Sequence, residues 1–277
     1  MTRTGDGADV GGFAALRTVG FEPLAPVTGA AVFSPPLGYD MCWNGPRRNP
    51  VVDEVAEQYE RDVRELALER MRRACVAAGG HGVVGATLAV RPFLQDSLEY
   101  VIAGTAVRAG GSPPRRGARP FTAGVDAAGL AKLLRAGWMP VALIFGVAVR
   151  AVHDTSGSLQ RSSMDNVELS TSTLLVKAAR AAARAALAAG AARAGARSVL
   201  LGDTGLKVCE QPCETGRGAV DRDGVEIEAE DRIARADMTG TAIVQLHRPI
   251  GAPAGRPLSI MRLDRGRRPA TNWRNEP

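Results

Sequence analysis

Residues 12–32 (GFAALRTVGFEPLAPVTGAAV) recur further along the chain as residues 129–149 (GLAKLLRAGWMPVALIFGVAV). The two stretches align without a gap at an offset of 117 residues (129 − 12), and nine of the 21 aligned positions are identical. Glycine, proline and small apolar residues make up most of the identities. Self-similarity at a fixed offset is the sequence signature of a repeated structural unit. The stretch therefore predicts a chain built from two copies of one fold.

Two further matches extend the duplication. The same offset carries residues 83–85 (VVG) onto residues 200–202 (LLG), and residues 104–107 (GTAV) match residues 240–243 (GTAI) at an offset of 136. The second copy thus has 19 extra residues (136 − 117), which we place at about residues 207–226.

These matches divide the chain. We predict a first repeat over residues 12–109, a linker over residues 110–124 and a second repeat over residues 125–248. Residues 249–277 are rich in Pro, Gly and Arg, a composition typical of a flexible tail.

Hydrophobic patterning predicts a β-α-β-β unit in each repeat, with a short leading helix. Long helices are expected over residues 52–78 and 167–194. The first has two apolar stripes, which indicates that more than one of its faces is buried. The second is dominated by alanine and needs a close partner, because a bare alanine surface buries little area. The fold class is α+β: two three-stranded antiparallel sheets, each covered by one long helix. Such thin sheets have exposed edges that favour assembly with other copies.

Composition narrows the class of protein. The 277 residues carry a formal charge of +6, but much of the excess lies in residues 47–48, 115–119 and 256–274, with only Trp273 as an interleaved aromatic residue. Nucleic acid is therefore a disfavoured partner. The first residues lack the apolar segment of a signal peptide, and the longest apolar stretch, residues 138–149, is too short to span a bilayer. We expect a cytoplasmic protein without membrane insertion.

One family resemblance follows from the first repeat. Residues 64–90 (RELALERMRRACVAAGGHGVVGATLAV) and 104–108 (GTAVR), with residues 20–33 as an opening strand, are similar to the YbjQ-like family of heavy-metal-binding domain proteins. The second repeat resembles the same family as a degenerate copy. The resemblance implies a dodecin-like fold and a homo-oligomeric ring of fivefold symmetry. It also implies a metal ion or small ligand held at subunit interfaces.

The residues offer one candidate metal site. Cys209 and Cys213 lie close in sequence within the extra residues of the second repeat, and His247, or else His153, could complete a site for a soft ion such as Zn²⁺ or Cu⁺. The same two cysteines are also compatible with a reversible disulfide or with no role, and no paired C-x-x-C pattern is present. Cys75 falls on an apolar helix stripe, where a buried structural thiol is expected.

A second candidate is a short hydrophobic patch in a loop, formed by Met41, Cys42 and Trp43, which could bind a ligand or pack against a neighbouring subunit. The chain lacks a nucleophile elbow, a P-loop and a dinucleotide fingerprint, so we expect no catalysis. The favoured interpretation is a non-enzymatic oligomer that holds a metal or ligand. The alternatives are a structural scaffold whose closed ring is itself the function, and an enzyme with an unrecognised interfacial site.

Overall fold

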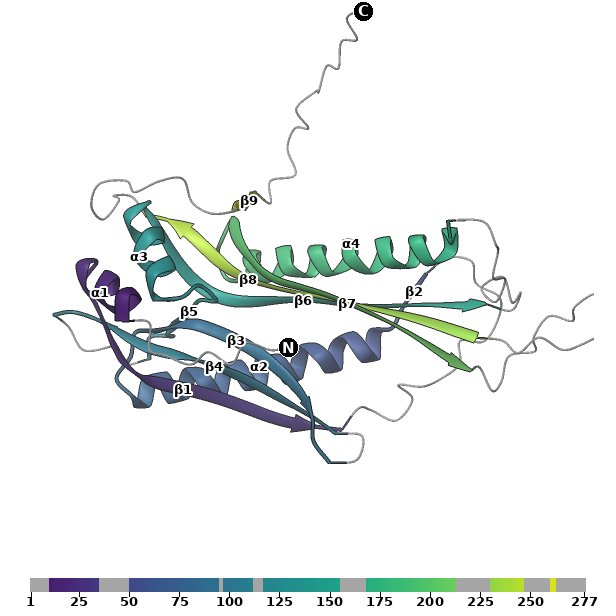
Figure 1. Ribbon diagram of the computed structural model, residues 1–277, viewed down its shortest axis with the longest axis horizontal. Helices are drawn as coiled ribbons and strands as arrows, with labels where there is room; N and C mark the ends of the chain where they lie inside the picture. Colours follow the sequence, from purple (N-terminus) through teal and green to yellow (C-terminus); the bar gives the residue numbers. More distant parts are fainter. Residues whose placement is uncertain are drawn as a thin grey trace, which may run out of the picture.

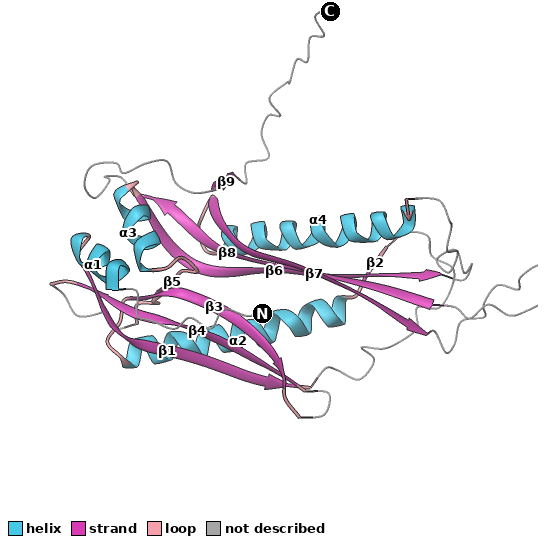
Figure 2. Ribbon diagram, in the orientation of Figure 1, coloured by secondary structure: helices cyan, strands magenta, loops and turns pink. Residues whose placement is uncertain are grey.

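The computed structural model describes seven segments of the chain: residues 10–34, 50–94, 97–111, 117–154, 168–212, 230–246 and 260–262. They form four helices and two mainly antiparallel sheets (Figures 1 and 2). The α+β class predicted from the sequence is confirmed. No helix in the described segments is long and apolar enough to cross a membrane.

The first repeat builds one sheet with the strand order β1-β4-β3-β5. Its elements are, in chain order, α1 (Val10–Thr18), β1 (Phe21–Phe33), β2 (Val51–Val52), α2 (Glu54–Ala77), β3 (Gly82–Pro92) and β4 (Leu98–Ala109). The second repeat builds the other sheet, ordered β2-β6-β8-β7-β9. The remaining elements are β5 (Phe121–Thr122), α3 (Ala127–Arg135), β6 (Trp138–Asp154), α4 (Ser170–Arg193), β7 (Ser198–Pro212), β8 (Glu230–Gln245) and β9 (Ile260–Arg262).

Two short strands tie the repeats together, so neither sheet is limited to the three strands expected. β2 precedes α2 in the first repeat but pairs with β6 of the second, and β5 of the linker pairs in parallel with β3. The end of the linker is buried at Thr122, whose hydroxyl accepts a hydrogen bond from the backbone N–H of Leu143 at 2.8 Å. The repeats are therefore interlocked.

The long helices are equivalent but not equally anchored. The side chain of Asp53 caps α2 by accepting from the N–H of Ala56 at 2.9 Å, as expected of an N-cap residue. The corresponding residue before α4 is Leu169, which makes no side-chain cap. Alanine-rich α4 forms through its high helix propensity and through packing on its own sheet.

Close helix-to-strand packing fixes how the repeats correspond. A Cβ on Gly29 would lie 2.1 Å from the carbonyl oxygen of Ala67, and one on Gly146 would lie 2.2 Å from that of Ala183. The strands are 117 residues apart (146 − 29), whereas the helices are 116 apart (183 − 67). Val83 correspondingly matches Val199, because they take the same place against Gly104 and Gly240. The predicted match of residues 83–85 to 200–202 is thus wrong by one residue.

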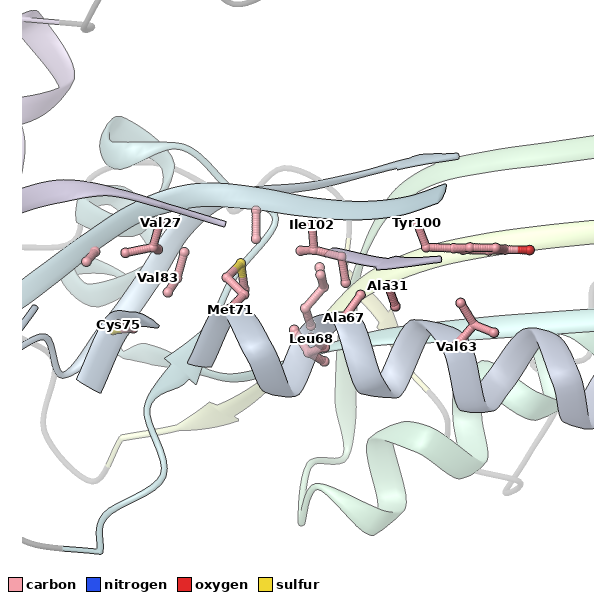
Figure 3. Close-up of a cluster of buried hydrophobic side chains, with 13 residues drawn as sticks. Val27, Ala31, Val63, Ala67, Leu68, Met71, Cys75, Val83, Tyr100 and Ile102 are labelled. Carbon is pink, nitrogen blue, oxygen red and sulfur yellow. The ribbon is translucent and has the colours of Figure 1, made fainter. Parts of the chain in front are cut away.

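The main hydrophobic core lies between α2 and the first sheet. Figure 3 shows Val63, Ala67 and Met71 of α2 pointing toward the sheet, where Tyr100 and Ile102 of β4 lie. Leu143 of β6 belongs to the same buried cluster. The core of the first repeat therefore continues onto the sheet of the second.

The layers run α4, second sheet, α2, first sheet. Figure 1 shows α4 on one side of β6, β7 and β8, with α2 and the first sheet on the other side. Helix α2 contacts β1 and β4 of its own repeat and also β6 of the other. The prediction that two faces of this helix are buried agrees with this arrangement, and the second face is covered by the partner repeat.

Candidate functional site

The predicted metal ligands are only partly within the described residues. Cys209 is a half-buried free thiol in β7, opposite Ile233 of β8. Cys213 and His247 lie outside the described residues, and so do Met41, Cys42 and Trp43. Whether these residues come together stays a prediction.

The alternative histidine ligand has another role. His153 is buried in β6, and its Nδ1 lies 2.6 Å from a carboxylate oxygen of Asp231 on β8. Cys75 is also buried, and burial raises its pKa to about 11, so the thiol stays protonated at neutral pH. Within the described segments, no group of three or more His, Cys, Asp or Glu residues could hold a metal ion.

Instead, the structure gathers a polar cluster between the two repeats, with two buried and two half-buried members. Glu60 and Arg64 of α2 meet Arg235 and Asp237 of β8, and we call these four residues the inter-repeat quartet. Arg64 donates to Glu60 at 2.5 Å and to Asp237 at 2.6 Å. Arg235 contacts Glu60 and lies 3.2 Å from Asp237. The quartet alternates acid and base around a closed loop of four ion pairs.

Tyr100 of β4 completes the environment of Glu60. Its hydroxyl donates to the Glu60 carboxylate at 2.9 Å, and the guanidinium of Arg64 lies 5.6 Å from the centre of its ring. Burial and the neighbouring charge of Glu60 raise the pKa of Tyr100, so the phenol remains a neutral donor. Glu60 is fully buried, and its charge is held by two cations and this hydroxyl. Such a cluster fixes the position of α2 on the sheet of the second repeat, because sliding the helix along this sheet would leave a buried charge unpaired.

A second set of contacts anchors the start of α2 on β6. The carboxylate of Glu57 pairs with Arg150 and accepts from the backbone N–H of Val149 at 3.0 Å. The backbone N–H of Asp53 donates to the carbonyl oxygen of Val149 at 3.2 Å. The contact between the repeats is not reciprocal. The long helix of the first repeat covers the outer face of the second sheet, which is the face opposite α4.

The described residues do not form the reverse contact, between α4 and the first sheet. By the helix offset of 116, Glu60 and Arg64 of α2 correspond to Val176 and Arg180 of α4. Arg180 is exposed and Val176 half-exposed, and no ion pair of Arg180 is found in the described part of the chain. No described residue therefore covers the face of α4 that corresponds to the interface face of α2.

Sequence reasoning missed the quartet. Glu60 and Arg64 are spaced four residues apart on a charged helix, which usually indicates a solvated ion pair. The available signal was the contrast between the repeats, because the aligned positions in the second helix carry no acid.

Comparison with known proteins gave one informative match. No family model matches the chain. A protein of Mycobacterium tuberculosis named encapsulin nanocompartment protein is 31% identical over 142 residues, which cover 50% of this chain and 52% of the relative. The chain thus spans about half the length of the relative it matches.

Two expectations from the sequence are corrected by these findings. The resemblance to the YbjQ-like family is wrong, since no family model matches and the relative found carries a different description. The metal-binding function was inferred from that resemblance and is therefore wrong as well. A charged helix followed by a glycine turn and a small-residue strand meets packing demands that recur in unrelated proteins, so it is a weak family marker.

Proposed function

We propose that this chain is a structural, non-enzymatic protein of the cytoplasm that assembles with copies of itself, and that its assembly forms part of a protein compartment. The observation that supports this proposal most directly is the unequal burial of two equivalent helices. Helix α2 is covered on two faces because the second repeat offers it a sheet, whereas the described residues cover α4 with its own sheet alone.

Another copy of the chain can supply a sheet face to cover α4, namely the outer face of its first sheet. Strands β1 and β4 of the first sheet correspond to β6 and β8, and their outer face is the counterpart of the face that α2 covers. Val32 on this face is 44% exposed, and Glu99 and Val101 are half-exposed. Repeating the contact found within the chain would seat α4 of one copy on the first sheet of the next. A heterologous contact of this kind continues from chain to chain until it closes.

The exposed face of α4 and the outer face of the first sheet, which we call the two open faces, have complementary residues. In the quartet, Arg235 and Asp237 correspond to Glu99 and Val101 by the strand offset of 136 (240 − 104). The contact between copies would therefore join Val176 and Arg180 of α4 to Glu99 and Val101 of β4. The two acidic positions of the quartet are both valine in this contact, and its two arginine positions become one arginine and one glutamate, which carry opposite charges. The apolar pair and the ion pair would replace a four-charge cluster without leaving a buried charge unpaired.

At the start of α4, an apolar residue likewise replaces the charged residue found at the start of α2. Leu169 takes the place of Asp53 and is 49% exposed, while Val32 takes the place of Val149. These two apolar side chains would meet where the chain itself uses a backbone hydrogen bond at 3.2 Å between Asp53 and Val149. Exposed apolar residues gathered on matching faces are typical of interaction surfaces.

The relative supports the same role. Its name describes a component of a protein nanocompartment, and the matched region covers about half of each chain. A closed compartment needs a subunit that contacts its neighbours through repeated, directional surfaces, and the two open faces meet this need.

Sedimentation velocity of the purified full chain, with electron microscopy of the same sample, tests this proposal. We expect particles that contain several copies of the 29.0 kDa chain. Val32→Asp should shift them toward single chains, because it places a charge in an apolar contact, while Val76→Asp should leave them intact. Val76 is a comparably exposed valine, 53% exposed, outside the proposed contact. Single chains of the unchanged protein at tens of micromolar would contradict the proposal.

A further inference from the structure

An arginine-lined groove lies along β6 with both long helices in its walls, and its most buried cation lacks a full set of partners among the described residues. The groove has a volume of about 460 Å³ and runs between α2 and α4 along β6. The side chain of Arg72 is 7% exposed and lines this groove, and its Nε has no hydrogen-bond partner among the described residues. A buried guanidinium N–H without an acceptor is costly, so its presence points to a partner that arrives from outside the chain.

The groove carries an excess of positive charge. Its walls hold Arg61, Arg72, Arg119 and Arg193 against the single carboxylate of Glu65. Burial, followed by the nearby charge of Arg119, lowers the pKa of Arg72 to about 10, so the guanidinium is still charged at neutral pH.

The nearest carboxylate outside the groove does not remove this excess. Glu69 lies 4.0 Å from Arg72, 3.9 Å from Arg119 and 3.6 Å from Arg73. One carboxylate therefore serves three guanidinium groups, all at distances longer than a hydrogen bond. An anion placed among them would relieve the mutual repulsion of the arginines.

The floor of the groove is apolar. It is formed by side chains of α2, β6 and α4, including Leu68, Ile144, Phe145, Val147 and Ala189. An apolar floor beneath a basic rim fits a ligand with an apolar body and an anionic head. The planar guanidinium group binds phosphate and carboxylate oxygens in pairs, and a doubly charged head best matches the excess of arginines.

We propose that the groove between α2 and α4 binds a small organic phosphate, with Arg72 donating to its phosphate oxygens and the apolar floor holding its body. The site is independent of the proposed assembly, because its α4 wall contains Ala186, Ala189 and Arg193, whereas the assembly face contains Val176 and Arg180.

Isothermal titration calorimetry with phenyl phosphate, using the full chain at low ionic strength, tests the site. We expect saturable binding that weakens as salt is added, and weaker binding of inorganic phosphate, which lacks the apolar body. Arg72→Met should weaken binding at least tenfold, because it removes charge-assisted hydrogen bonds. Arg73→Met is the matched control: its side chain is 78% exposed and shares Glu69, and binding should be unchanged.

A second variant guards against loss of folding. Arg193→Met changes an exposed side chain on the opposite wall and should also weaken binding, with an unchanged circular dichroism spectrum. Absence of binding of phenyl phosphate at millimolar concentration would overturn the proposal. Equal affinities of the unchanged protein and a folded Arg72→Met variant would overturn it as well. Sedimentation of the same samples keeps this result separate from the question of assembly.

Discussion

Glu60→Leu is expected to lower the free energy of unfolding by about 3–5 kcal/mol, the range found when one partner of a buried ion pair is removed. Glu60 is fully buried and is the carboxylate shared by Arg64, Arg235 and the hydroxyl of Tyr100. Its loss leaves two guanidinium groups facing each other, with Asp237 as their remaining acid. Urea unfolding at a fixed protein concentration measures the effect.

Two further variants show whether charge causes the loss. Glu54→Leu changes an exposed carboxylate at the start of the same helix and should cost less than about 1 kcal/mol. Glu60→Gln keeps the size and the hydrogen-bonding atoms and should fall between the two. A Glu60→Leu protein as stable as the unchanged one would show that the quartet does not hold the repeats together.

Gly29→Ala should destabilise the protein by about 1–3 kcal/mol, and Gly29→Val by more, because α2 packs directly on the backbone of β1. A Cβ at Gly29 would lie 2.1 Å from the carbonyl oxygen of Ala67 and 2.3 Å from the backbone nitrogen of Met71. Both are backbone atoms, so the helix itself must move away from the sheet and open the core shown in Figure 3. The shift in the midpoint of thermal unfolding checks this.

Gly205→Ala is the control for this prediction. Its added Cβ would lie 3.8 Å from the Cβ of Asp237, an ordinary contact, so the stability should change little. Equal effects of the two alanine substitutions would mean that the close approach of α2 to β1 is not a constraint on the fold.

Much of the architecture could be predicted because the repeats are marked by glycines with a packing role. Gly29 and Gly146 align at an offset of 117 and both admit a helix against a strand. The long helices were predicted to within three residues at each end, since their apolar and alanine patterns are continuous. Strands β2 and β5 could not be predicted, because each has two residues and no periodicity of its own.

The ion pairs between α2 and the second sheet could not be predicted from the sequence, for a different reason. Whether the charges of α2 face solvent or the second sheet depends on how the repeats stack, and stacking is decided by contacts far apart in sequence, such as Arg64 to Asp237. The extra residues of the second repeat illustrate the same limit. Those up to Pro212 extend β7 by pairing with β8, so Cys209 lies in a strand.

We propose above that copies of this chain associate by repeating the contact that already joins its two repeats. The most direct test reverses the charges that this contact would pair between copies, Arg180 of one and Glu99 of the next. Arg180→Glu and Glu99→Arg should each weaken association at least tenfold in a sedimentation titration, because like charges would then face each other, and the double variant should recover most of the loss. Lys132→Glu, an exposed charge reversal on α3, should have no effect. A double variant that associates no better than either single variant, or single variants that associate like the unchanged protein, would contradict the claim.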